Sequence, residues 1–101
     1  MHGEAQARAA MEQGAAYVVA GPVFRTTSKP GHPGSGTLLL ERIVGIVAPV
    51  PVFAIGGIDA ANTPRVIHAG AHGIAVRGAL MAAGDPRRVA EALRLALRVA
   101  R

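Results

Sequence analysis

The sequence predicts an α/β fold in which short parallel strands alternate with helices. Three segments are short and apolar along their whole length, which is typical of strands in a parallel sheet covered on both faces. Each is followed by a glycine and then by a segment that favours a helix, so the expected order is one helix and then strand–helix three times. A partial repeat supports this order, because a helix-ending glycine, a strand and a second glycine occur at 14–21 and again at 70–78.

The amino-terminal half is predicted to contain two helices and one strand. The alanine-rich segment 4–13 ends at Gly14, as expected for a helix with a glycine stop. Residues 17–20 form the first expected strand. The segment 25–37 is dense in proline and glycine and is predicted to be a loop. Thr37 then serves as a candidate cap for a helix that runs to about residue 47.

The middle of the chain is predicted to contain the second strand and its helix. The all-apolar segment 52–55 is the strand, and it ends at Gly56 and Gly57. Asp59 is expected to cap a helix that runs to about Ala69, with a proline near enough to its first turn to be tolerated.

The last strand and helix follow in the same way. Residues 74–76 form the third expected strand, which ends at Arg77 and Gly78. The pair Asp85-Pro86 is typical of an N-cap followed by proline at the first helical position, and it begins a final helix to about residue 99.

The bulk composition limits the class of protein. A chain of 101 residues forms one domain at most, and it has no cysteine for disulfides or thiolate metal sites. No apolar run reaches the roughly 18 residues that a membrane span needs. The first residues lack the basic and then apolar order of a signal peptide. We therefore expect a cytoplasmic protein that does not enter a membrane.

The formal net charge of +5 does not by itself indicate nucleic-acid binding. Five of the ten arginines lie in the last fifteen residues, where helical spacing places most of them on one face of the final helix. A solvated outer face explains this cluster. Only three residues are aromatic, too few for the stacking platforms that single-strand binders use.

Three polar turns are expected to meet at one edge of the sheet, because the carboxyl ends of parallel strands point the same way. The turns are 21–29, Gly56-Gly57 and Arg77-Gly78. The first holds three hydroxyl residues and then Lys29, the only lysine in the chain, where a compact ammonium suits an anion. The glycines permit close backbone approach, and the helix after them offers N–H groups to a phosphate. Each turn alone is equally consistent with a tight turn, a surface charge or a polar loop; together they favour an anion site.

No metal or catalytic motif stands out among the remaining polar residues. The four histidines are scattered and lack a metal-ligand spacing such as H-x-x-x-H. Asp59 is best interpreted as a helix cap, with general base as the alternative. No two carboxylates are placed as a magnesium pair.

Four segments carry a family resemblance: Gly-Ala-Ala-Tyr at 14–17, Gly-Pro-Val-Phe-Arg-Thr-Thr-Ser-Lys at 21–29, Pro-Val-Phe-Ala-Ile-Gly-Gly-Ile at 51–58 and Ala-Gly-Ala-His-Gly-Ile-Ala-Val at 69–76. Together they resemble the thiamine phosphate synthase family, which includes the related thiazole tautomerases. The resemblance implies that residues 1–101 are the C-terminal segment of a (βα)₈ TIM barrel. They would form the last three βα units, strands six to eight, with the preceding helix.

The resemblance also implies a reaction in thiamine biosynthesis. A hydroxymethylpyrimidine diphosphate loses pyrophosphate, and the nitrogen of a thiazole phosphate attacks the resulting carbon. Lys29 matches the lysine that steadies the leaving pyrophosphate. Six further positions match residues that contact the thiazole phosphate: Thr26, Thr27, Ser28, Gly57, Arg77 and Gly78. The family's magnesium (Mg²⁺) ligands lie on earlier strands, so no metal ligand is expected in this chain.

Departures from the family pattern leave two alternatives open. Ser28 replaces the usual threonine but keeps the hydroxyl, and Arg77 replaces a more usual aliphatic residue. Pro22 is shared with the synthases, whereas some thiazole tautomerases place a catalytic histidine there. The alternatives are a thiazole tautomerase and a non-catalytic half-barrel that binds phosphates. Because the missing strands leave two open sheet edges, the expected partners are the absent N-terminal part of the barrel or a second copy.

Overall fold

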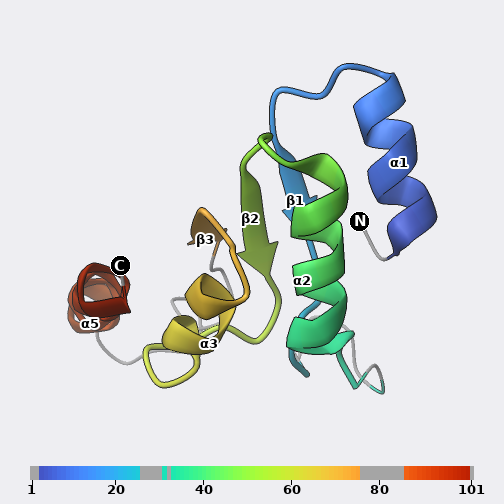
Figure 1. Ribbon diagram of the computed structural model, residues 1–101. Helices are drawn as coiled ribbons and strands as arrows, with labels where there is room; N and C mark the ends of the chain where they lie inside the picture. Colours follow the sequence, from blue (N-terminus) through green and yellow to red (C-terminus); the bar gives the residue numbers. More distant parts are fainter. Residues whose placement is uncertain (1–2, 26–30, 32, 76–85, 101) are drawn as a thin grey trace.

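The computed structural model describes residues 3–25, 31, 33–75 and 86–100 (Figure 1). They form four helices and a three-stranded sheet in the predicted order of one helix and then strand–helix three times. The elements are α1 (Glu4–Glu12), β1 (Val18–Ala20), α2 (Gly36–Val47), β2 (Val52–Ile55), α3 (Thr63–His68), β3 (Gly73–Ala75) and α5 (Pro86–Ala100). None of the described helices is long and apolar enough to cross a bilayer.

The sheet is parallel throughout, with β2 between β1 and β3. Val18 of β1 lies beside Val52 of β2, and Phe53 of β2 lies beside Gly73 of β3. The mixed α/β fold with a parallel sheet is therefore confirmed, and among the described strands β1 and β3 form the edges.

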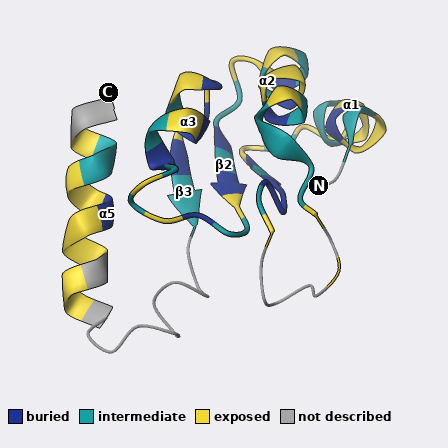
Figure 2. Cartoon of the chain, turned by 90° about the horizontal axis from the view of Figure 1, so that it is seen from below, coloured by how far each residue is buried: buried dark blue, intermediate teal, exposed yellow. Residues whose placement is uncertain are grey.

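The helices lie on one face of this sheet. In Figure 2, α2 and α3 stand along one side of the strands, with α1 beside α2. The strand residues directed to that side are buried, among them Val18, Val52 and Ala54. The other face carries no helix among the described residues. The expectation that both faces are covered is thus met for one face only.

The core forms where α2 and α3 pack on the covered face. Leu40, Ile43 and Val47 recur three and four positions apart in α2, so they share the stripe that faces the sheet. Val66 from α3 is fully buried in the same cluster. Burying such side chains contributes about 1.5–3 kcal/mol each, which makes this layer the main source of stability.

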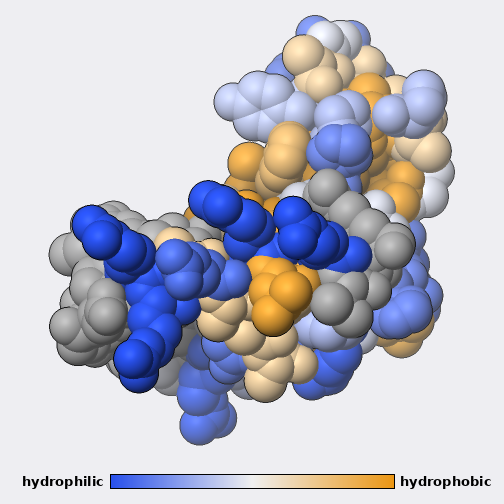
Figure 3. All heavy atoms as spheres, turned by 90° about the vertical axis from the view of Figure 1, so that its left-hand side faces the viewer, coloured by the Kyte–Doolittle hydropathy of each residue, from blue (hydrophilic) through white to orange (hydrophobic). Residues whose placement is uncertain are grey.

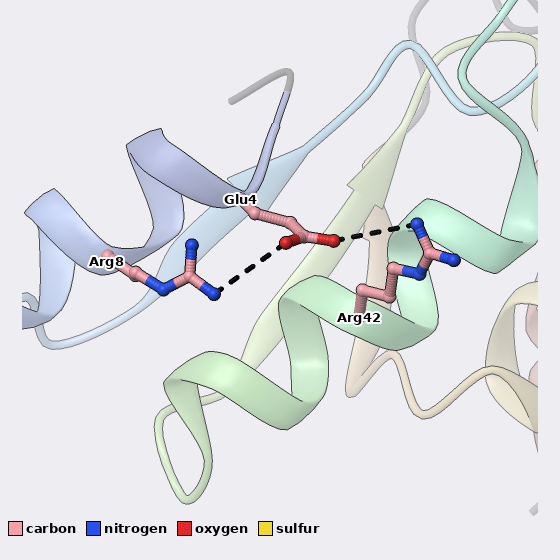
Figure 4. Close-up of polar contacts among 3 residues, drawn as sticks. All are labelled: Glu4, Arg8 and Arg42. Carbon is pink, nitrogen blue, oxygen red and sulfur yellow. Dashed lines mark ion pairs between the residues drawn. The ribbon is translucent and has the colours of Figure 1, made fainter.

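Helix α1 attaches to α2 through one buried alanine and a set of surface charges. Ala7 is fully buried in the shared core. The Glu4 carboxylate lies 3.7 Å from the guanidinium groups of both Arg8 and Arg42, which ties the two helices together (Figure 4). All three side chains are partly or largely exposed, so each ion pair contributes only about 0–1 kcal/mol.

Several element boundaries differ from the predicted ones. Helix α3 begins at Thr63 and not after Asp59, because residues 59–62 form a hydrogen-bonded turn. Strand β1 begins at Val18, one residue later than predicted. Helix α2 begins at Gly36 without a side-chain cap, so the predicted capping role of Thr37 is wrong.

Helix α5 agrees with its prediction at the start. It begins at Pro86 and packs against α3, with Leu93 buried. Arg87, Arg94 and Arg98 are exposed, as the solvated-face interpretation requires.

Replacing Gly45 by alanine is expected to stabilise the protein. Gly45 is exposed within α2, and a Cβ added there meets no atom within 4 Å. Alanine in a helix interior gains about 0.5–1 kcal/mol over glycine, so the thermal midpoint rises. Gly14→Ala is the matched control, because its Cβ also meets open space but its φ is +71°. That variant lowers the midpoint; equal shifts in both variants contradict the argument.

Candidate functional site

The turns that follow β1 and β2 lie side by side at the carboxyl end of the sheet. The backbone N–H of Val23 donates to the carbonyl of Ile55 at 2.9 Å, and that of Phe24 donates to the carbonyl of Gly56 at 3.1 Å. These two bonds extend the β1–β2 pairing beyond the strands. We call this edge, formed by residues 21–25 and 56–59, the rim.

The long loop after β1 also returns to the rim. The N–H and hydroxyl of Ser35 both donate to the carbonyl of Pro22, at 2.8 and 3.0 Å. The N–H of Gly36 donates to the carbonyl of Val23 at 2.8 Å. The chain therefore leaves the rim after Arg25 and is fixed to it again before α2. Four predicted site residues fall between these anchors and lie outside the described residues: Thr26, Thr27, Ser28 and Lys29.

The rim glycines are required by the contact between the two turns. A Cβ on Gly21 overlaps the carbonyl oxygen of Ile55, and one on Gly56 lies 2.5 Å from Cα and Cβ of Pro22. A Cβ on Gly57 overlaps the Arg25 carbonyl oxygen and comes within 2.8 Å of Phe24 Cβ. The close approach that Gly56-Gly57 predicts is therefore an approach of one loop to another. A ligand is not needed to explain these glycines.

The turn that follows Gly57 is held by two side chains that bond reciprocally. The N–H of Asp59 donates to Oδ1 of Asn62 at 2.9 Å, and the N–H of Asn62 donates to Oδ1 of Asp59 at 2.8 Å. Nδ2 of Asn62 also donates to the carbonyl of Gly57 at 2.9 Å. This is the arrangement of a capping box. The N-cap of α3 is Asn62, so the predicted role of Asp59 as the N-cap of this helix is wrong, and Asp59 instead closes the turn that precedes α3.

The same network leaves backbone donors at the rim. Among the described residues, the N–H groups of Gly57 and Ile58 have no hydrogen-bond partner. The Gly57 carbonyl, in contrast, accepts a hydrogen bond from the Asn62 side chain. Sequence reasoning missed Asn62, although the Asp-x-x-Asn spacing is a signal for a capping box. Two adjacent N–H groups in a fixed turn are able to bind an oxyanion.

Two arginines add positive charge beside these donors. The Arg65 guanidinium carbon lies 5.0 Å from the centre of the Phe24 ring, a cation–π distance. Arg25 is exposed next to Phe24 in the chain. In Figure 3, strongly hydrophilic side chains lie at mid-height and in the lower half of the flank that faces the viewer. Arg25 and Arg65 place two positive charges near the rim against the one negative charge of Asp59, and this balance favours an anion.

The described residues do not fit a magnesium site. No group of three acidic or histidine side chains among them lies together. The carboxylate of Asp59 already accepts the Asn62 N–H. His72 lies at the opposite end of the sheet, where its N–H donates to the Val52 carbonyl at 2.7 Å.

The structure thus places one of the seven predicted site residues, Gly57, at the rim. Arg77 and Gly78, which follow β3, lie outside the described residues, as do the four residues of the first loop. The rim itself is confirmed for two of the three turns, those that follow β1 and β2.

Comparison with known proteins identifies the family of this chain. The sequence model of the TMP-TENI family, described as thiamine monophosphate synthase, matches residues 1–80. The thiamine-phosphate synthase of Thermus thermophilus is 42% identical over 93 residues, which cover 92% of this chain and 45% of the relative. That of Geobacillus thermodenitrificans is 44% identical over 102 residues, with 98% of this chain and 45% of the relative covered.

A solved structure shows the same likeness in three dimensions. The thiamine phosphate pyrophosphorylase from Pyrococcus furiosus superposes with a TM-score of 0.86 at 36% identity, over 99% of this chain and 47% of that one. The chain therefore spans about half the length of the relatives that it matches. With a family match over most of its residues, the chain belongs to the thiamine monophosphate synthase family.

Proposed function

We propose that this chain is the C-terminal half of a thiamine phosphate synthase-like (βα)₈ barrel. Its strands are the sixth to the eighth, with α1 as the preceding helix. The paired turns at the rim are the observation that carries this proposal, because they bring the β1 loop and Gly57 to one edge. The family match over residues 1–80 supports it.

The half-site binds the thiazole phosphate in this proposal. The N–H groups of Gly57 and Ile58, which have no partner within the described part of the chain, are donors for phosphate oxygens at a turn that is already fixed by Asn62. Thr26, Thr27 and Ser28 supply hydroxyl donors from the neighbouring loop. Arg77 and Gly78 complete the phosphate contacts from the turn after β3.

Lys29 steadies the departing pyrophosphate. Loss of pyrophosphate from the pyrimidine diphosphate leaves an electron-poor carbon, and the thiazole nitrogen attacks that carbon. The positive charge of Lys29 offsets the negative charge that develops on the leaving group. Pre-positioned charges and donors of this kind commonly account for ~10²-fold or more in rate.

The chain alone is not a competent synthase in this proposal. It spans 45–47% of its relatives, and the resemblance places the family's magnesium ligands on earlier strands. The remaining segment would supply the metal and pyrimidine parts of the site.

Replacing Lys29 by alanine is expected to lower the rate of thiamine phosphate formation about 10²-fold or more. The assay uses this chain joined to the remaining segment of the Thermus thermophilus synthase, with both substrates and magnesium. Arg94→Ala is the matched control, because it removes the same charge from an exposed site on α5. Equal losses in the two variants contradict the role of Lys29. Conversion of thiazole phosphate without the diphosphate would favour a tautomerase instead.

Replacing Asn62 by alanine is expected to weaken binding of the thiazole phosphate. The variant loses the side-chain bonds to Gly57 and Asp59 that fix the turn. At about 0.5–1.5 kcal/mol for one such bond, the Kd rises roughly 2–10-fold in calorimetric titration. Gln13→Ala removes a similar amide at the exposed end of α1 and leaves the Kd unchanged. An unchanged Kd in the Asn62 variant would show that the turn does not hold the phosphate.

A further inference from the structure

Arg65 connects the start of α3 to the rim through the ring of Phe24. Its guanidinium carbon lies 5.0 Å from the centre of that ring, within the range of a cation–π interaction. Arg65 is exposed, and within the described part of the chain its side chain makes no ion pair. The contact with Phe24 is therefore the interaction that the structure gives this side chain.

Phe24 in turn contacts the turn that carries the candidate phosphate donors. Its N–H donates to the Gly56 carbonyl at 3.1 Å. The position that a Cβ on Gly57 would occupy lies 2.8 Å from Phe24 Cβ and 3.0 Å from its carbonyl carbon. Phe24 thus touches Arg65 with its ring and the backbone of Gly57 with its own backbone and Cβ.

Helix α3 is fixed to the same turn, so the position of Arg65 is also fixed from its main chain. The N–H and hydroxyl of Thr63 both donate to the Asp59 carbonyl, at 3.0 and 2.6 Å, and Thr63 is fully buried. The N–H of Arg65 donates to the Asn62 carbonyl at 3.1 Å. Arg65 is therefore held to the turn at 59–62 by its backbone and to Phe24 by its side chain.

We propose that Arg65 is a positioning residue of the phosphate site. Its cation holds Phe24, and through Phe24 it keeps the N–H groups of Gly57 and Ile58 in the geometry that binds an oxyanion. This inference rests on the proposed function, in which those N–H groups bind the thiazole phosphate. The rival explanation is that Arg65 attracts the phosphate by its charge alone, and the two explanations differ in the part that the Phe24 ring plays.

Hydrogen exchange tests the structural step without any ligand, in the joined protein used for the Lys29 variant. The Phe24 N–H is measured against that of Val23, which donates to the Ile55 carbonyl on the same turn. Arg65→Met keeps the length of the side chain and removes its charge. It is expected to raise the exchange rate of Phe24 relative to Val23 roughly 2–5-fold, as loss of an exposed cation–π contact implies. Arg94→Met, at an exposed site on α5, is the matched control and leaves the ratio unchanged.

Calorimetric titration with the thiazole phosphate tests the link to the site. Arg65→Met is expected to raise the Kd roughly 2–5-fold, and Arg65→Lys, which keeps a cation over the ring, to restore most of the affinity. The same two substitutions are then made together with Phe24→Leu, which keeps an apolar side chain but removes the ring. In that background the Met and Lys variants are expected to have the same Kd, because the cation no longer has a ring to hold.

Two outcomes overturn the inference. One is a difference in Kd between the Met and Lys variants that persists without the ring, because it would show that charge alone acts on the phosphate. The other is an unchanged exchange ratio in Arg65→Met. Arg65 is exposed, so its variants are expected to keep the circular dichroism of the parent protein, and the exchange test needs no change at Phe24. A parent protein that binds no thiazole phosphate refutes the proposed function, and the exchange ratio then decides by itself whether Arg65 holds the rim.

Discussion

The pair of backbone hydrogen bonds between the β1 and β2 turns determines most of the features at the rim. Val23 and Phe24 donate to the carbonyls of Ile55 and Gly56 and hold the two turns in contact. This contact leaves no room for side chains at Gly21 or Gly56. It also fixes the start of the long loop, and Ser35 and Gly36 fix its return.

The strands could be predicted from sequence because short apolar runs between glycines have few other interpretations. The bounds of Val52–Ile55 were predicted correctly. The start of α3 was not, because Asp59 and Asn62 satisfy each other's N–H groups and hold a separate turn ahead of the helix. Such a pairing depends on side-chain geometry. The helix and turn propensities of these residues do not distinguish it from an ordinary helix N-cap.

The site was predicted less completely than the fold. Gly57 lies at the rim as expected, but its close contact is with Phe24 and Arg25. A glycine pair in sequence does not show whether a ligand or a neighbouring loop comes close. The assignments of Lys29 and Arg77 remain predictions from family resemblance. The face of the sheet without a described helix escaped prediction, because the same apolar pattern fits a strand with helices on both faces and a strand with helices on one face only.

The parallel order of the sheet also constrains how the chain folds. Val18 pairs with Val52 only after the long loop and α2 have been placed between them, whereas Phe53 pairs with Gly73 across a shorter stretch. Closing the longer stretch costs more chain entropy. Pairing of β2 with β3 therefore costs less chain entropy than pairing of β1 with β2. We expect the folding nucleus on the α3 side of the sheet, with β1 joining later. During synthesis β1 leaves the ribosome before β2, which is its only strand partner among the described residues.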